Sequence, residues 1–121
     1  MDDLVQRDGL WYEKFNDIPF SGKIDEGRTR TTFEDGKREG SWQGYYKNGQ
    51  LHGKGEYVDG KKSGFWVFYH DNGHKSLEGK YINGKKEGVW VSYHKNLDGS
   101  KGTKYESLWS GTFKNGVKVS D

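Results

Sequence analysis

The pattern of aromatic and polar positions repeats along the centre of this chain with a period of 24 residues. A Gly-x-Trp-x-x-Tyr segment begins at Gly40, at Gly64 and at Gly88. A fixed period of this length is typical of repeat proteins, in which one supersecondary unit packs against copies of itself. We therefore expect each copy to form two β-strands and the copies to stack side by side.

Asn48-Gly49 and Asn72-Gly73 predict the turn within each copy, because Asn-Gly is the strongest short signal for a two-residue type I′ hairpin. The register that follows places these residues opposite one another: Trp42 and Gly55, Tyr46 and Leu51, Trp66 and Gly79, Phe68 and Leu77. Each indole then faces a glycine and can cover the slot that the glycine leaves in the sheet.

The third copy is longer than the first two. Trp and its paired glycine are 13 residues apart in the second copy, whereas Trp90 and Gly111 are 21 apart. Because an insertion of eight residues is even, the following strand keeps its faces. The sequence predicts a longer hairpin with its tip near Ser100-Lys101, and Trp109 is expected on the face that carries Trp90.

Composition indicates an all-β fold in a single domain, residues 1–121. Alanine is absent and glycine occurs 19 times, so few segments favour helix. The 16% of aromatic residues and the net charge of +2 distinguish the chain from a disordered one. We expect a single antiparallel meander of stacked β-hairpin repeats, with about nine or ten strands.

The period divides the domain into segments. Regular copies occupy residues 40–63, 64–87 and 88–119, the last with the insertion near 97–104. Residues 9–39 are irregular, as expected of a cap, which has one neighbour instead of two. The smaller elements we expect are a polar lead-in at 4–8, strands at 10–15, 20–25 and 28–34, turns at 16–19, 26–27 and 115–116, and an edge strand at 117–121.

The Gly-x-Trp-x-x-Tyr, Asn-Gly and Gly-x-Tyr-x-x-Gly-Lys pattern resembles the MORN repeat, in the variant found in bacterial proteins of the YwqK antitoxin type. Residues 9–14 and 19–23 also resemble the N-terminal part of that group, and the resemblance covers roughly residues 9–119. It implies an array of β-hairpins that binds and neutralises a partner toxin. MORN arrays also serve as membrane-proximal modules and assembly platforms, and relatives of this kind often carry secretion signals.

The sequence also bears on compartment and partners. No run of about 18 apolar residues occurs, and residues 1–4 lack a basic and then apolar signal segment. The chain as written therefore predicts a cytoplasmic protein, and a periplasmic or exported one if a signal peptide was removed. The absence of cysteine excludes disulfides, and a pI near 8.7 does not indicate a nucleic-acid partner.

Candidate catalytic chemistry is sparse. His70 and His94 are equivalent positions in neighbouring copies, about 10 Å apart at about 4.8 Å per strand, which is too far for one metal ion. No nucleophile, base and orienting residue form a recognisable set, and no glycine cluster precedes a helix. The sequence therefore predicts a protein that is not an enzyme and has no metal or cofactor site.

Two stripes of side chains remain as candidate binding surfaces. One face of the sheet is expected to carry the tryptophans 42, 66, 90 and 109, with Phe68 between them. The opposite face is expected to carry the candidate partner-binding residues: Tyr45, Val67, Tyr69, Val91 and Tyr93. Basic residues form a second stripe, expected in solvated turns along one sheet edge: Lys37, Arg38, Lys61, Lys62, Lys85 and Lys86.

A sheet without helices cannot cover both faces unless it curls, and contiguous exposed apolar surface tends to be a contact site. Our first hypothesis is therefore a non-catalytic protein-binding module, of the antitoxin or immunity type, that uses the face around Tyr69. The alternative is a peripheral membrane-associated or assembly scaffold that uses the basic turns. We prefer the first, because solubility and protection of sheet edges already explain the charged turns. The partner's identity and the oligomeric state stay open.

Overall fold

The computed structural model describes residues 4–13, 18–26, 28–107 and 109–120, and every regular element in this part of the chain is a β-strand. The strands are β1 (Leu4–Arg7), β2 (Leu10–Glu13), β3 (Gly22–Glu26), β4 (Thr29–Glu34), β5 (Lys37–Tyr45), β6 (Leu51–Val58), β7 (Lys61–Tyr69), β8 (Lys75–Ile82), β9 (Lys85–Tyr93), β10 (Lys104–Tyr105), β11 (Gly111–Lys114) and β12 (Val117–Ser120).

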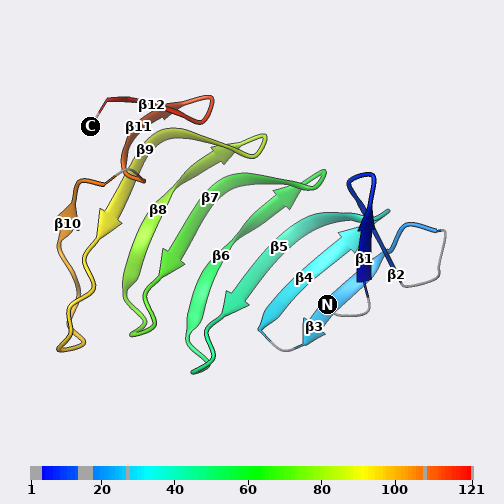
Figure 1. Ribbon diagram of the computed structural model, residues 1–121, viewed down its shortest axis with the longest axis horizontal. Helices are drawn as coiled ribbons and strands as arrows, with labels where there is room; N and C mark the ends of the chain where they lie inside the picture. The colour runs from blue at the N-terminus through cyan, green and yellow to red at the C-terminus, as the bar shows by residue number, and fades with distance from the viewer. Residues whose placement is uncertain (1–3, 14–17, 27, 108, 121) are drawn as a thin grey trace.

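Ten of these strands form one antiparallel sheet in which strands adjacent in the chain pair in order from β3 to β9. β9 then pairs with β10 through one part of its length and with β11 through another, and β12 forms the edge beside β11. Figure 1 shows the result as one curved layer, with the separate β1–β2 hairpin crossing one end. The predicted all-β meander is confirmed.

Type I′ turns join the repeats rather than lying within them. At Asp59-Gly60 both residues have positive φ, 53° and 80°, and Val58 pairs with Lys61. The same two-residue geometry recurs at Asp35-Gly36, Asn83-Gly84 and Asn115-Gly116. These turns are also fixed to the preceding repeat unit, because the Gly60 N–H donates to the Arg38 carbonyl at 3.0 Å.

The predicted two-residue turn at Asn48-Gly49 is wrong. The Gly49 N–H donates to the Tyr46 carbonyl at 2.9 Å, and the Tyr46 N–H donates to the Gln50 carbonyl at 2.8 Å, which leaves a three-residue loop. Only Gly49 has positive φ in this loop, 87°, as in a type I turn closed by a glycine bulge. The turn at Asn72-Gly73 has the same hydrogen bonds from Gly73 and His70.

The three-residue loop shifts the register by one, and an extra residue in β6 shifts it back. Tyr45 pairs with Leu51 while Gly44 pairs with Gly53, so His52 is unpaired between them. The predicted pairing of Tyr46 with Leu51 is therefore wrong. The predicted pairs of Trp42 with Gly55, Trp66 with Gly79 and Phe68 with Leu77 are confirmed.

A second irregularity precedes each tryptophan and decides which glycine it covers. Between β6 and β7, Gly55 lies opposite three residues, Gly64 to Trp66, and Gly64 has a φ of 72°. Such a bulge bends a strand and re-aims its side chains. A Cβ built on Gly55 would overlap the Trp66 indole, and one on Gly79 would overlap that of Trp90. The expectation that Trp66 covers its paired Gly79 is thus wrong, because Trp66 and Trp90 each cover the glycine of the preceding strand.

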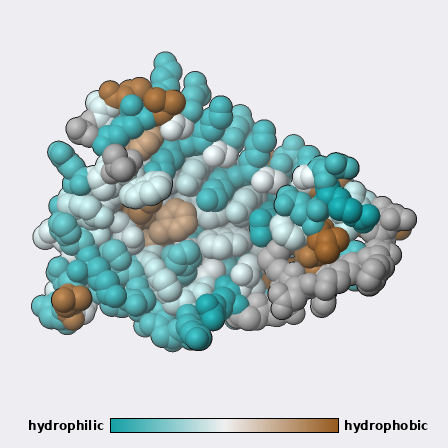
Figure 2. Space-filling model, in the orientation of Figure 1, coloured by the Kyte–Doolittle hydropathy of each residue, from teal (hydrophilic) through white to brown (hydrophobic). Residues whose placement is uncertain are grey.

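The core lies on the face that carries these indoles. Trp66 and Trp90 are each 1% exposed, and Phe113 joins them at the C-terminal end. Trp66 stacks on Trp42 at 5.4 Å between ring centroids, and its Nε1–H donates to the Glu56 carbonyl at 3.1 Å. Figure 2 shows apolar atoms near the middle of the visible face, surrounded by hydrophilic surface. The sheet therefore forms its core from one row of aromatic rings.

The N-terminal segment covers the other end of this row. The predicted polar lead-in at residues 4–8 is instead strand β1, which pairs with β2 through an Asp8-Gly9 turn. Trp11 packs edge-to-face on Phe33 at 6.1 Å, and its N–H donates to the Gly36 carbonyl at 2.7 Å. Phe33 is only 2% exposed as a result. The predicted turn at 16–19 and the end of the strand at 10–15 lie largely outside the described residues, as does half of the turn at 26–27.

The eight inserted residues of the third copy are not divided equally between the two arms of its hairpin. Tyr105 pairs with Ser92, whereas Gly111 pairs with Trp90 as predicted, so the segment between β10 and β11 leaves the ladder. The Gly99 N–H donates to the Asn96 carbonyl at 3.1 Å, which places the hairpin tip two residues before the predicted Ser100-Lys101. The predicted C-terminal edge strand is confirmed as β12.

Candidate functional site

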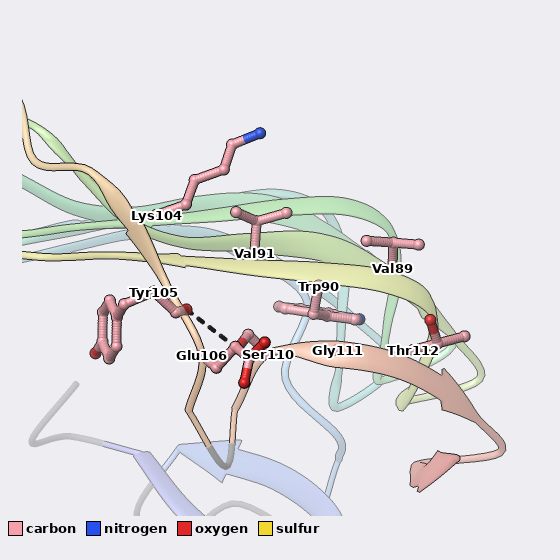
Figure 3. Close-up of a pocket in the computed structure, with 9 residues that line it drawn as sticks. All are labelled: Val89, Trp90, Val91, Lys104, Tyr105, Glu106, Ser110, Gly111 and Thr112. Carbon is pink, nitrogen blue, oxygen red and sulfur yellow. Dashed lines mark hydrogen bonds between the residues drawn. The ribbon is translucent and has the colours of Figure 1, made fainter. Parts of the chain in front are cut away.

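The two faces of the central sheet differ in character. We call the face with Trp66 and Trp90 the tryptophan face, and the opposite one, with Val67 and Val91, the valine face. Figure 3 shows the division at β9, where the Trp90 side chain lies on the other side of the strand from Val89 and Val91. The tryptophan face holds the core, so the valine face is the less covered of the two.

The five predicted partner-binding residues lie on the valine face. Val67 is 9% exposed, and Tyr45, Tyr69, Val91 and Tyr93 are half-buried. Two hydroxyls are held within the sheet, since Tyr45 donates to Gln43 Oε1 at 3.1 Å and Tyr93 donates to Glu78 Oε1 at 2.9 Å. The Tyr45 and Tyr93 side chains are therefore held against the sheet by these hydrogen bonds and do not project from it.

Burial alone would raise the pKa of the Glu78 carboxyl, but hydrogen bonds from Lys75 and Tyr93 outweigh it and hold the pKa below its usual value. The Lys75 Nζ lies 2.8 Å from Glu78 Oε2. Glu78 is thus ionised at neutral pH and fixes one tyrosine and one lysine on the valine face.

The residues that do project were missed from the sequence. Phe65 is 64% exposed and Val89 67%, and they occupy equivalent positions in neighbouring repeats. Each follows the bulge glycine and alternates with Trp, so it points to the same face as Val67 and Val91. The signal was present as a large apolar residue in the middle of two Gly-x-Trp segments.

Two hollows flank these residues. One, of 460 Å³, is lined by Phe65 and Val67 together with the charged side chains of Lys54 and Glu56. The other, of 350 Å³, is lined by Val89 and Val91 and reaches the gap where β11 separates from β10 (Figure 3). Both therefore combine apolar walls with charged groups, an arrangement that suits side chains of a protein partner.

The predicted stripe of solvated basic turns is wrong. These residues begin β5, β7 and β9, where alternation sends them to opposite faces. Lys37 and Lys61 run over the turn glycines of the next repeat on the valine side, and the Lys37 Nζ lies 3.0 Å from Asp59 Oδ1. Lys62 and Lys86 lie on the tryptophan face instead. Of the six residues, only Lys61 and Lys85 are exposed as expected.

Each half-buried cation packs against aromatic rings. The Lys62 Nζ lies 5.2 Å from the Trp66 ring centroid and 5.1 Å from that of Tyr81. The Lys86 Nζ lies 4.6 Å from Trp90, and Arg38 lies over Phe33 and Trp11. Burial lowers the pKa of both lysines, with a further contribution from Arg38 to Lys62 and from Lys62 to Lys86. The three cations thus form one electrostatically connected row.

Replacing Tyr57 and Tyr81 together with Phe is expected to reduce the loss of stability at alkaline pH. Burial raises the pKa of both hydroxyls above the usual 10.0. The folded state therefore retains their protons better than the unfolded state, and this stabilisation is complete below about pH 10 and lost as the pH rises through the higher folded-state pKa. Melting temperatures measured between about pH 9 and 11 test it.

The lowered lysine pKa values act in the opposite direction, but they are common to both proteins and cancel in the comparison. A double Phe variant that loses stability over this range as steeply as the wild type would contradict the assignment.

The histidines have structural contacts. His70 Nε2 lies 2.8 Å from the Tyr93 carbonyl oxygen, and His74 Nε2 lies 2.9 Å from that of Gly99, so both connect neighbouring turns. His94 stacks on Tyr105 at 4.1 Å between centroids. Within residues 4–13, 18–26, 28–107 and 109–120, no three acidic or histidine side chains are grouped as metal ligands. The described part of the chain also contains no helix long and apolar enough to cross a membrane.

Comparison with known proteins adds no assignment. No protein-family model matches the chain, and no curated protein sequence matches it significantly.

Proposed function

We propose that this protein is a non-catalytic repeat module that binds a partner protein through its valine face. The observation that carries the proposal is the exposure of Phe65 and Val89, at 64% and 67%, beside the less exposed Val67 and Val91. Large apolar residues that project from a supported surface are typical of contact sites. We assign partner binding to the valine face because the large rings of the tryptophan face form the core.

The hollows beside Phe65 and Val89 support the same proposal. A partner side chain that enters one of them meets an apolar wall and a charged rim, and such a centre carries most of the binding energy in protein interfaces. The repeat period places the two hollows two strands apart, so a partner that spans both contacts three or more strands. An immunity or antitoxin role, which the MORN resemblance implies, is the specific form of this proposal.

Phe65→Ser is expected to weaken partner binding by about 2 kcal/mol or more, since exposed aromatic residues at the centre of an interface contribute on that scale. Because Phe65 is largely exposed, the change is expected to leave the free energy of unfolding within about 0.5 kcal/mol of wild type. The measurement is capture of a partner from the source organism, followed by titration calorimetry with the purified partner.

Leu97→Ser is the matched control, because Leu97 is 97% exposed at the tip of the β9–β10 hairpin and lies outside the proposed surface. Equal affinities for wild type and Phe65→Ser, or an equal loss in Leu97→Ser, would argue against the valine face.

A scaffold or peripheral membrane module that uses the basic residues receives less support. The row of six cations is divided between the faces, so no single surface presents all of it. One of the cations on the valine side, Lys37, is also paired with Asp59. Binding to anionic vesicles that persists after Phe65→Ser would favour this alternative.

A further inference from the structure

Charges on the tryptophan face of β5 to β9 have one sign. The register places Arg38, Lys62 and Lys86 on this face. The carboxylate residues of the same strands alternate onto the valine face: Glu39, Glu56, Glu78 and Glu87. The described strands β5 to β9 therefore give this face cations and aromatic rings without a carboxylate.

Lys62 shows the consequence most clearly. Its half-buried ammonium contacts the rings of Trp66, Phe68 and Tyr81, with the Phe68 centroid at 5.8 Å, and no oxygen of the described residues accepts a hydrogen bond from it. An ammonium has three N–H donors and no acceptor. A donor that is partly removed from water and has no acceptor is costly, so an anion that supplies one is bound favourably. The neighbouring hydroxyls of Tyr57 and Tyr81 likewise make no hydrogen bond to the described residues and can donate to the same anion.

The spacing indicates which anion fits. Lys62 and Lys86 occupy the same repeat position two strands apart, about 10 Å at about 4.8 Å per strand, and each has its own aromatic walls. Lys86 donates one of its three N–H groups to the Trp109 carbonyl at 2.8 Å and keeps the others for a ligand. A single phosphate favours cations that converge on it, whereas separate cations match carboxylates distributed along a chain. A polypeptide in the polyproline II conformation advances about 3.1 Å per residue, so carboxylates at every third position recur about every 9 Å. The methylene groups of glutamate also suit the ring walls.

We infer that the tryptophan face binds an acidic polypeptide segment that crosses the strands and places successive carboxylates on Lys62 and Lys86. This contact is separate from the partner surface proposed on the valine face.

The probe is a fluorescein-labelled synthetic peptide with glutamate at every third position and serine and proline between. The same peptide with glutamine in place of glutamate is the uncharged control. Fluorescence anisotropy is expected to show binding of the glutamate peptide alone. Lys62→Gln is expected to weaken it about tenfold, the effect of losing one charge-assisted hydrogen bond. Lys62→Arg keeps the charge and is expected to bind.

Lys61→Gln is the matched control, because it removes the same charge one residue away on the opposite face. It is expected to leave the affinity unchanged, as is Phe65→Ser, so failure of this inference and failure of the proposed function are distinguishable. Circular dichroism and melting temperatures establish whether each variant is folded. If Lys62→Gln does not fold, Lys86→Gln provides the second test.

Three results would overturn the inference: equal weakening by Lys61→Gln and Lys62→Gln, equal binding of the glutamine peptide, or no binding of the glutamate peptide at low salt. A fourth is inorganic phosphate or vesicles of phosphatidylserine that bind in a Lys62-dependent way while the peptide does not, because the ligand would then be a phosphate group.

Discussion

Gly79→Val is expected to destabilise the protein by about 3–5 kcal/mol. The new Cβ would overlap the indole of Trp90, which is 1% exposed and packs against Tyr81 and the Lys86 ammonium. Overpacking usually costs about 1–3 kcal/mol, but displacing a buried tryptophan also forfeits its packing, as truncation of such a residue does. Urea unfolding followed by circular dichroism measures the change in the free energy of unfolding.

A pair of double variants identifies the clashing ring. Trp90→Leu removes the atoms that meet the new side chain, so Gly79→Val adds little further destabilisation in that background. Trp66→Leu leaves the clash in place, and there the effect of Gly79→Val stays nearly as large as in the wild type. Relief by Trp66→Leu instead would show that the tryptophan covers its paired glycine and would contradict the observed packing.

Trp66→Ala is the second large effect, at about 3–5 kcal/mol in the same unfolding measurement. The ring stacks on Trp42 at 5.4 Å, lies edge-to-face with Tyr57 at 5.2 Å, and donates a hydrogen bond to the Glu56 carbonyl. Its loss leaves a cavity between three strands that the neighbouring rings cannot fill without leaving their own contacts.

Trp109→Ala is the control, because that indole is 64% exposed and, among the described residues, its ring contacts the Lys86 ammonium alone, at 5.3 Å. We expect a cost of less than about 1 kcal/mol there, the scale of an exposed cation–π contact. Similar costs at both positions would mean that the core is not the row of rings centred on Trp66.

The repeat period predicted the architecture correctly because every copy must satisfy the same pairing. It predicted the turns less well. Asn48-Gly49 has the composition of a type I′ turn, yet the structure forms that turn at Asp59-Gly60, and one extra residue, His52, compensates for the difference. The pairing of Trp42 with Gly55 was therefore right although the assumed turn was wrong, and no local rule reveals such a compensation.

Irregular backbone geometry also limited the prediction of the candidate site. A bulge at Gly64 directs the Trp66 indole toward β6 instead of β8 and leaves Phe65 exposed. A simple alternation of side chains between the two faces predicts neither effect. The prediction of one basic stripe was wrong because adjacent residues such as Lys61 and Lys62 belong to a strand and therefore point to opposite faces. Sequence periodicity identifies equivalent residues, but the register decides what each of them contacts.

The N-terminal end was hard to predict because it does not repeat. β1 is only four residues long, and its Leu4 is 8% exposed. The hydrogen bond from the Trp11 N–H to the Gly36 carbonyl joins residues that no repeat relates. Caps are therefore recognised by position in the array and not by motif.

Hydroxyl-radical footprinting of the protein with a partner captured from its source organism tests the central claim most directly, because it reports which face is covered. The account predicts that Phe65 and Val89 become protected in the complex while Trp109 and Leu97 react as they do in the free protein. Protection of Trp109 and Leu97, with Phe65 and Val89 as reactive as before, would contradict the assignment of the valine face as the partner-binding surface.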